Sequence, residues 1–305
     1  MIAKRRKFFA HCEAFRLSHF ELDSRLTVDY YAGYLLFTYY QNYPHSNLPD
    51  LAEAFAHELA KAGLPFRGAV KKFRPENLSH ASGDALAPPG APRLLLGETP
   101  PERFTIREFD LRFLVSCHAG FSTGLFLDIK LARRRVTQRV KPGDQVLNLF
   151  SYTGGFSIAA AQAGASRVIE VDSSAHWLSW AKENQQLNGV EVVRQRREEA
   201  VKFLHKQKEG TFDFILCDAP TYSSHKSGAR FGVAQGFAEM RDDFWRVLRP
   251  GGFLLASTNF RGLSRREFFQ IFDSGWRLLE QVPISADFAG DDYLKIGLFE
   301  RSPGK

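Results

Sequence analysis

Residues 146–155 read VLNLFSYTGG, a short apolar run followed by a turn that holds two adjacent glycines. The run predicts a buried strand over 146–150, and the small residues after it predict a helix over 155–164. A second apolar strand over 168–171 ends at Asp172, and from Asp144 onward further strands and helices alternate. Such alternation predicts an open, mostly parallel α/β sheet with helices on both faces, the Rossmann-like architecture.

The remaining elements of this sheet follow from the same two periodicities. Further strands are expected at 191–194, 212–217 and 253–257, and further helices at 128–140, 175–187, 199–205 and 237–248. Arg249-Pro250-Gly251-Gly252 is expected to stop the last of these helices and to lead into its strand.

The chain before residue 128 predicts a smaller α+β domain. Residues 26–41 are rich in β-branched and aromatic side chains around Gly33 and predict a hairpin. Apolar residues then recur at helical spacing up to Ala62-Gly63, and 68–73 predicts another strand. We therefore expect a small domain over 1–78 with possible RNA contact, a linker over 79–102, a β-hairpin connector over 103–127 and the large domain over 128–305.

Composition limits the classes of protein that fit. The 305 residues are 44% hydrophobic and 25% charged, and the net charge of +7 suits a polyanionic partner such as RNA, with Arg194–Arg197 one of several basic clusters. The three cysteines lie far apart, which argues against a disulfide framework or a cysteine metal site. No apolar run is long enough for a membrane span, and no signal peptide is evident, so the cytoplasm is expected.

Residues at strand ends are the candidates for ligand binding, since ligands of open α/β sheets lie beyond the carboxyl ends of the strands. Gly154 allows a ligand to approach the backbone closely, and the next helix offers free N–H donors. Asp172 could accept both ribose hydroxyls of an adenosine, although a helix N-cap is its alternative role. Glu199 could accept the adenine amino group, or could simply favour the first turn of its helix.

The strand over 212–217 is followed by DAPTYS at 218–223. A polar-proline-aromatic turn at a strand end presents carbonyls and a ring to a planar amine, and Tyr222 could stack on a base. The alternative is an ordinary corner between strand and loop. Four such segments in one order, each at a strand end, favour a nucleoside site.

These segments resemble a known family, the bacterial 23S ribosomal RNA methyltransferases, which are class I enzymes dependent on S-adenosylmethionine. FSYTGG at 150–155, with Asp172 after it, is similar to their cofactor half. TGLFLDIKLARR at 123–134, DAPTYS at 218–223 and residues 15–40 are similar to the branch that methylates guanine at N7. Ala219, Lys130 and Glu199 depart from that branch, which usually has Pro, Arg and Asp there.

The resemblance implies S-adenosyl-L-methionine as cofactor and RNA, in particular ribosomal RNA, as substrate. The cofactor-binding residues it implies are Phe150, Ser151, Tyr152, Thr153, Gly154, Asp172, Ser173, Glu199 and Asp218. The catalytic residues it implies are Asp218, Pro220 and Tyr222, and the substrate-binding residues are Phe126, Asp128, Lys130, Thr221 and Tyr222. Guanine N7 needs no proton removed before it attacks, so positioning and desolvation would supply most of the catalysis.

Three alternatives stay open at this point. A cytosine-C5 methyltransferase needs a thiolate, which related enzymes place directly after Asp-Ala-Pro, where this chain has Thr221, whereas Cys217 is expected to point into the sheet. A dehydrogenase would use Asp172 in the same way but needs GxGxxG in the first turn. A non-catalytic RNA-binding protein on the same scaffold would fit Ala219 and Lys130.

Overall fold

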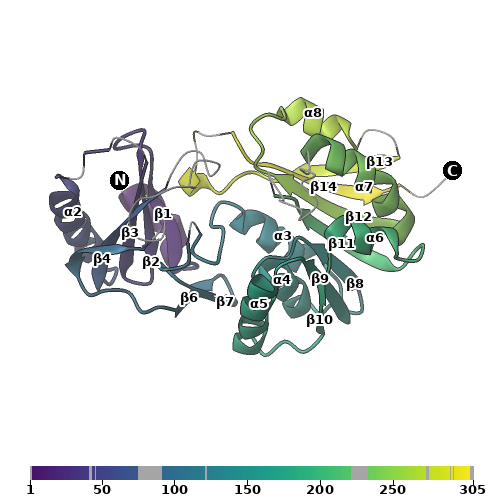
Figure 1. Cartoon of the computed structure of the whole chain (residues 1–305), viewed down its shortest axis with the longest axis horizontal. Coiled ribbons are helices and arrows are strands. Elements are labelled where there is room, and N and C mark those ends of the chain that lie inside the picture. The colour runs from purple at the N-terminus through teal and green to yellow at the C-terminus, as the bar shows by residue number, and fades with distance from the viewer. Residues whose placement is uncertain are drawn as a thin grey trace, which may run out of the picture. The chain divides into compact units, whose positions relative to one another are not determined.

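The chain folds into two compact units (Figure 1). The computed structural model describes residues 2–40, 43–44, 46–74, 91–120, 122–220, 233–272, 275–288, 290 and 292–302. The first unit comprises Met1–Asp128 and Ser285–Ala289, and the second comprises Ile129–Ile284 and Gly290–Lys305. Each unit has its own sheet and its own hydrophobic core.

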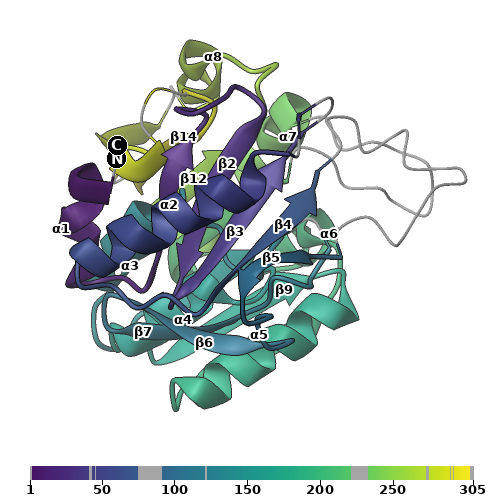
Figure 2. The same cartoon turned by 90° about the vertical axis from the view of Figure 1, so that its left-hand side faces the viewer.

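The first unit is built on a five-stranded sheet with one helix across it (Figure 2). Its strands are, in spatial order, β1 (Ala14–His19), β2 (Leu26–Tyr31), β3 (Tyr34–Tyr39), β4 (Gly68–Phe73) and β5 (Arg93–Gly97). The helix α2 (Leu48–Lys61) presents Leu48, Phe55 and Leu59 to apolar side chains of β1, β2 and β3, so one face of the sheet forms the core. The short helices η1 (Ile2–Arg5) and α1 (Arg6–Phe9) add Ile2 and Phe8 to it.

The predicted hairpin and helix of this unit are confirmed. Ala32 and Gly33 both have positive φ, 47° and 103°, as a two-residue hairpin turn requires, and they join β2 to β3. A second hairpin, β6 (Phe104–Glu108) and β7 (Leu111–Val115), turns at Phe109, also as expected. The linker prediction is wrong for β5, because residues 93–97 pair antiparallel with β4 instead of running free.

A segment from far along the chain completes the first unit. The short helix η3 (Ala286–Phe288) carries Asp287, whose carboxylate accepts the backbone N–H of Arg16 on β1 at 2.9 Å. The guanidinium of Arg16 lies 4.3 Å from the ring centroid of Phe288 and is paired with Asp29 on β2. These residues fall within the range 128–305 of the predicted large domain, and no pattern in the sequence indicates that they return to the first unit.

The second unit is built on a seven-stranded sheet. Its strands are, in spatial order, β10 (Val193–Arg197), β9 (Arg167–Asp172), β8 (Gln145–Leu149), β11 (Phe212–Asp218), β12 (Leu248–Thr258), β14 (Lys295–Arg301) and β13 (Trp276–Gln281). The first five strands are parallel and the last two are antiparallel to their neighbours. The α/β prediction with a mostly parallel sheet is thus confirmed.

Helices cover both faces of this sheet. α6 (Ala200–His205), α7 (Val233–Val247) and α8 (Arg265–Gln270) pack on the face that carries Leu147, Ile169 and Ile215. Alternate strand residues, among them Asn148 and Glu170, point to the opposite face. There they contact α4 (Gly155–Gln162) and α5 (Ala175–Leu187), while α3 (Lys130–Arg139) packs beside α4.

Two predicted boundaries in this unit are wrong. The strand expected at 191–194 is β10 at Val193–Arg197, which places three arginines in the strand itself. Arg249–Gly252 does not separate helix from strand, because β12 begins at Leu248 and its register with β11 jumps from Phe212–Leu248 to Phe214–Phe253. These four residues form an irregularity within the strand. Within the described ranges, no helix is long and apolar enough to cross a bilayer.

Candidate functional site

The turn between β8 and α4 has an unusual backbone conformation. Phe150, Tyr152 and Gly154 have φ values of 56°, 50° and 80°, so every second residue is left-handed. Glycine adopts this region freely, whereas each non-glycine residue there costs about 1–2 kcal/mol. Such strain persists only where the surrounding structure holds it, and it clusters at ligand-binding sites.

The end of β9 holds this turn in place. The backbone N–H of Tyr152 donates to Oδ2 of Asp172 at 2.9 Å, and the N–H of Ser151 donates to the carbonyl of Val171 at 3.0 Å. The N–H of Ser174 donates to the other carboxylate oxygen of Asp172 at 2.8 Å. The turn and Asp172 therefore meet at one edge of the sheet, as the sequence predicted.

Asp172 keeps the capacity to bind hydroxyl groups. Burial raises the pKa of this carboxyl group, and the backbone hydrogen bonds from Ser174, Tyr152 and Ser173 oppose that rise. Its two oxygens accept the N–H groups of Tyr152 and Ser174, and a carboxylate has about four acceptor sites in all, so it can also accept from hydroxyl groups. The alternative role as N-cap of α5 is wrong, because Ser174 is the N-cap and accepts from the N–H of Trp177.

Side chains behind the turn reinforce it. Asn184 on α5, fully buried, donates to the carbonyl of Thr153 at 3.0 Å. Asn148 on β8 donates to the hydroxyl of Ser157 on α4 at 2.9 Å. The sequence analysis predicted no role for either asparagine, because neither lies in the turn itself. The one signal for them is that each occupies a position of its own element, α5 or β8, that faces the turn.

The predicted residues of this edge fit an adenosine-containing cofactor. The hydroxyl of Ser151 is buried and has no hydrogen-bond partner in the part of the chain that the structure describes, so a polar ligand group would satisfy it. Ser173 is exposed beside Asp172. The rings of Tyr152 and Trp177 lie 4.5 Å apart, which puts an aromatic pair at the same edge.

Glu199 also comes to this edge. The N–H of its neighbour Glu198 donates to the carbonyl of Asp172 at 3.2 Å. Glu199 is the N-cap residue of α6 and forms an ion pair with Lys202 at 3.1 Å. That position is compatible with both predicted roles of Glu199, binding of the adenine amino group and stabilisation of the first turn of α6. The role in binding adenine stays a prediction.

The end of β11 carries the second group of predicted residues. Oδ1 of Asp218 accepts a hydrogen bond from the hydroxyl of Ser257 on β12 at 2.7 Å, and Ser257 is fully buried. The N–H of Ala219 donates to the carbonyl of Ser257 at 3.2 Å. Ser257 was not predicted from the sequence. Pro220 follows, half-buried, and Thr221 and Tyr222 lie outside the described residues.

The other predicted substrate residues are divided between the units. Phe126 and Asp128 belong to the first unit, where Phe126 is 44% exposed and the carbonyl of Asp128 accepts the N–H of Ser285. Lys130 belongs to the second unit and is fully buried at the start of α3. Their joint role in closing the site stays a prediction.

Known proteins similar to this chain are methyltransferases. It is 35% identical over 179 residues to the ribosomal RNA large subunit methyltransferase K/L of Alcanivorax borkumensis, covering 58% of this chain and 25% of that protein. It is 30% identical over 249 residues to the ribosomal RNA large subunit methyltransferase I of Cronobacter sakazakii, covering 80% of this chain and 60% of that protein. The match therefore spans less than two thirds of the length of each of these relatives.

The fold and cofactor have a solved counterpart. The crystal structure of SMU.776 complexed with SAH, S-adenosylhomocysteine, matches 98% of this chain and 78% of that one, with a TM-score of 0.81 and 25% identity. The sequence profile of the S-adenosylmethionine-dependent methyltransferases matches residues 9–269. These matches confirm the predicted Rossmann-like fold, the enzyme class and the cofactor, and they exclude the dehydrogenase alternative. The chain belongs to the S-adenosylmethionine-dependent methyltransferase family.

Proposed function

We propose that this enzyme transfers the methyl group of S-adenosylmethionine to large-subunit ribosomal RNA, at N7 of a guanine. The observation that carries the RNA substrate is the similarity to two kinds of methyltransferase that are named for large-subunit ribosomal RNA, one of them over 80% of this chain. The net charge of +7 agrees with a polyanionic substrate.

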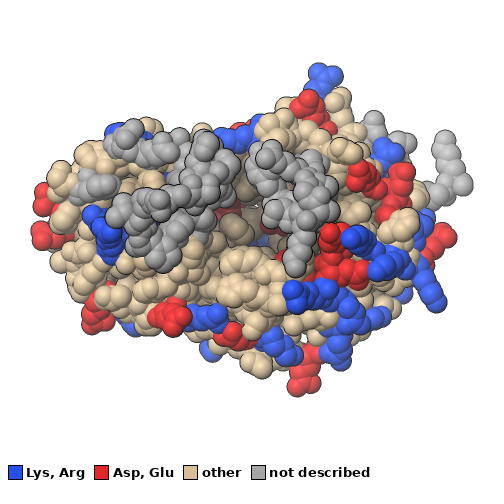
Figure 3. Space-filling view, viewed as in Figure 1, with Lys and Arg blue, Asp and Glu red and all other residues tan. Residues whose placement is uncertain are grey.

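A row of arginines on the edge strand β10 supports an RNA substrate. Arg194, Arg196 and Arg197 are exposed, and each donates to a backbone carbonyl. Across the described residues, none of the three is paired with a carboxylate. Lys and Arg lie over the surface of β10 and α6 together with Asp and Glu (Figure 3), and Lys202 and Lys206 of α6 are paired with Glu199 and Glu198. The arginines of β10 are therefore the positive charges that phosphate groups would meet there.

The residues at the end of β11 suit a reaction that needs no base. The cofactor supplies a methyl group on a positively charged sulfur, which the lone pair of guanine N7 can attack without loss of a proton. In this proposal, Asp218 and the carbonyls of Ala219 and Pro220 hold the guanine, and Tyr222 stacks on it. Ser257 orients Asp218 through the hydrogen bond at 2.7 Å. A guanine in a duplex must first be flipped out.

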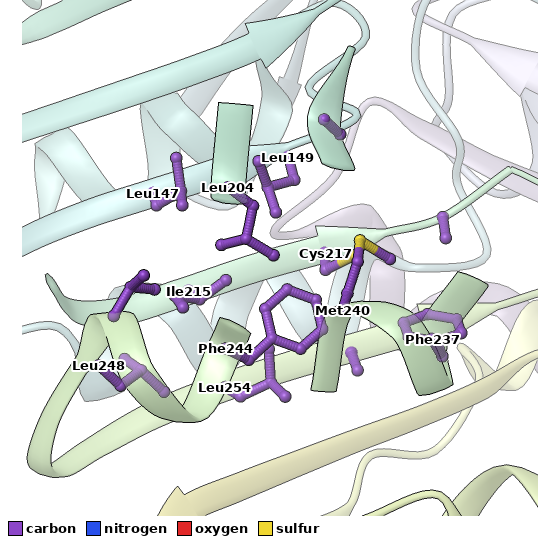
Figure 4. Packing of buried hydrophobic residues seen from close by; sticks show 14 of the residues in the cluster. Leu147, Leu149, Leu204, Ile215, Cys217, Phe237, Met240, Phe244, Leu248 and Leu254 are labelled. Carbon is purple, nitrogen blue, oxygen red and sulfur yellow. The ribbon is translucent and has the colours of Figure 1, made fainter. Parts of the chain in front are cut away.

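Methylation of cytosine C5 is the second candidate, and the surroundings of Cys217 argue against that thiol as its nucleophile. Cys217 is fully buried and packs among apolar side chains of β11 and α7, with Met240 and Phe237 nearby (Figure 4). Burial, together with the charge of Asp218, raises the pKa of the thiol well above its ordinary value. A thiol that stays protonated is a poor nucleophile, which favours the guanine reaction.

Transfer of labelled methyl groups to unmodified RNA tests the proposal. Ribosomal RNA that lacks its natural methylation is incubated with the enzyme and labelled S-adenosylmethionine, and the nucleosides are then separated. We expect label in large-subunit RNA as 7-methylguanosine. Label in 5-methylcytidine would favour the second candidate, and an enzyme that binds SAH but labels no RNA would contradict the RNA substrate.

A further inference from the structure

A layer of buried polar side chains lies behind the cofactor turn. Asn148, Glu170 and Gln195 are neighbours in register across β8, β9 and β10, and they point to the face covered by α4 and α5. Two helix residues, Ser157 and Gln185, contact this row from α4 and α5. Polar groups at such depth are normally fully hydrogen-bonded, so an exception in this layer needs an explanation.

Two members of this layer are exceptions: Gln185, whose Oε1 has no hydrogen-bond partner among the described residues, and Glu170. The side chain of Glu170 is fully buried, and its Oε1 accepts two amide donors, Gln185 at 2.6 Å and Gln195 at 2.7 Å. The same amide nitrogen of Gln195 also donates a hydrogen bond to the carbonyl of Leu178 in α5, so two hydrogen bonds hold the amide in place. The other carboxyl oxygen, Oε2, has no hydrogen-bond partner in the described ranges of the chain.

The unpartnered oxygen of Glu170 lies against the cofactor turn. A Cβ atom added at Gly154 would come within 3.0 Å of Oε2 of Glu170. Gly154 is the left-handed residue that ends the turn and directly precedes α4. The carboxyl group of Glu170, fully buried, therefore lies close behind the backbone of the turn at which the cofactor is expected.

No positive charge faces this carboxyl group from the elements packed around it. β8 and α4 contain no ionisable side chain. Those of α5 and of β10 are at least partly exposed: His176, Lys182, Glu183, Arg194, Arg196 and Arg197. The ionisable neighbour on the same face is Asp172, two residues farther along β9, and it is also acidic. Burial raises the pKa of Glu170 and the charge of Asp172 adds to the rise, whereas hydrogen bonds from Gln195, Ser157 and Gln185 oppose it; the net direction is upward, toward the neutral form.

We propose that Glu170 is a positioning residue for the cofactor, which supports the turn at Gly154 while it is protonated and weakens cofactor binding when it ionises. A carboxylate at Oε2 would draw donors toward it, namely the hydroxyl of Ser157 at the start of α4, the backbone at Gly154 or a water molecule, and the turn would shift with them. The added charge would also disfavour ionised Asp172, the predicted acceptor of the ribose hydroxyls. This inference depends on the cofactor alone and stands whether or not the substrate is RNA.

The affinity for SAH as a function of pH tests the proposal. Calorimetry, or the fluorescence of Trp177 beside Tyr152, reports binding between about pH 5 and pH 9. For the natural enzyme we expect affinity to fall about tenfold on the alkaline side as Glu170 ionises. Glu170→Gln keeps the shape and the neutral charge, so it should bind SAH as the protonated enzyme does and should lose this alkaline decline. Glu170→Ala should bind weakly at every pH.

A matched control and a kinetic readout separate positioning from general stability. Glu183→Gln makes the same change of charge at a less buried site on α5 and should leave the pH profile unchanged. At alkaline pH, Glu170→Gln should lower KM for S-adenosylmethionine and leave kcat at saturation the same. If Glu170→Gln keeps the alkaline decline, or loses affinity to the same degree as Glu170→Ala, the proposal is wrong. Should Glu170→Ala fail to fold, the comparison between Glu170→Gln and the natural enzyme still decides.

Discussion

The cofactor turn after β8 and the end of β11 lie at the same edge of one sheet but are held in different ways. The turn is fixed through its backbone: the N–H groups of Ser151 and Tyr152 and the carbonyl of Thr153 all have partners in β9 or α5. The side chain of Asp218 at the end of β11 accepts a hydrogen bond from the hydroxyl of Ser257, a side-chain contact with the neighbouring strand. In the proposed function, the cofactor would meet a preformed main-chain surface, and the reacting base would meet oriented side chains.

This difference predicts how the two regions respond to substitution. Changes in the turn should act on cofactor affinity and on stability together, because backbone geometry supports both. Changes at the end of β11 should lower the rate of transfer and have a much smaller effect on the affinity for the cofactor. Measuring SAH affinity, transfer rate and unfolding for each variant therefore separates the two regions.

The largest effect is expected for Asp218→Asn. The substitution replaces the carboxylate that accepts from Ser257 with an amide, at the position where the proposal places the target base. The rate of transfer should therefore fall on the order of 100-fold. SAH affinity, measured by calorimetry, should change by less than about tenfold. An equal loss in both quantities would show that Asp218 serves mainly the cofactor.

Gly154→Ala should have the next largest effect, in this case on the affinity for the cofactor. The new Cβ would be placed at φ 80°, 3.0 Å from Oε2 of Glu170 and 3.1 Å from Cβ of Ala181. The left-handed conformation alone costs about 1–2 kcal/mol, and the turn must also shift. We expect SAH affinity to fall about thirtyfold, that is about 2 kcal/mol.

Gly143→Ala is the matched control for this variant. Gly143 also has positive φ, 95°, but nothing lies within 4 Å of an added Cβ, and it precedes β8 at the other end of the strand. It should lower the free energy of unfolding by about 1 kcal/mol and leave SAH affinity unchanged. If both variants lose SAH affinity equally, the effect of Gly154→Ala reflects general strain.

The meeting of the turn with Asp172 could be predicted from the sequence, because parallel strands end at a common edge and the ligand-binding residues follow them. The bounds of α5 were also predictable, since Ser174 provides an N-cap before a long helical pattern. The strand β5 could not be predicted, because its residues lie close to a stretch rich in proline and glycine. They form a strand by pairing with β4.

The buried residues behind the site could not be predicted either. Within VIEVD at 168–172, Glu170 resembles an ordinary polar residue of a half-exposed strand, and its burial depends on Gln185 and Gln195 farther along the chain. Ser257 gains its role only because β12 lies beside β11 in the sheet. Such contacts depend on register between elements, which local patterns do not encode.

Asp172→Asn should weaken cofactor binding less than Gly154→Ala does. One oxygen that now accepts a backbone N–H, from Tyr152 or from Ser174, becomes an amide group that cannot accept it, which costs about 1–3 kcal/mol shared between stability and binding. We expect SAH affinity to fall about tenfold. Asp144→Asn, which removes a similar acceptor for the N–H of Lys141 in a turn away from the site, should leave SAH affinity unchanged.

Cys217→Ala should have the smallest effect on activity. Cys217 directly precedes Asp218, but its side chain points into the core instead of toward the edge where the ligands are expected. Removing the sulfur atom should therefore lower the free energy of unfolding by about 1 kcal/mol and change the rate of transfer by less than about twofold. Denaturant unfolding and transfer to unmodified RNA measure the two quantities. Loss of transfer with intact SAH binding would instead make Cys217 the nucleophile of a cytosine methyltransferase, and would require β11 to expose that side chain during the reaction.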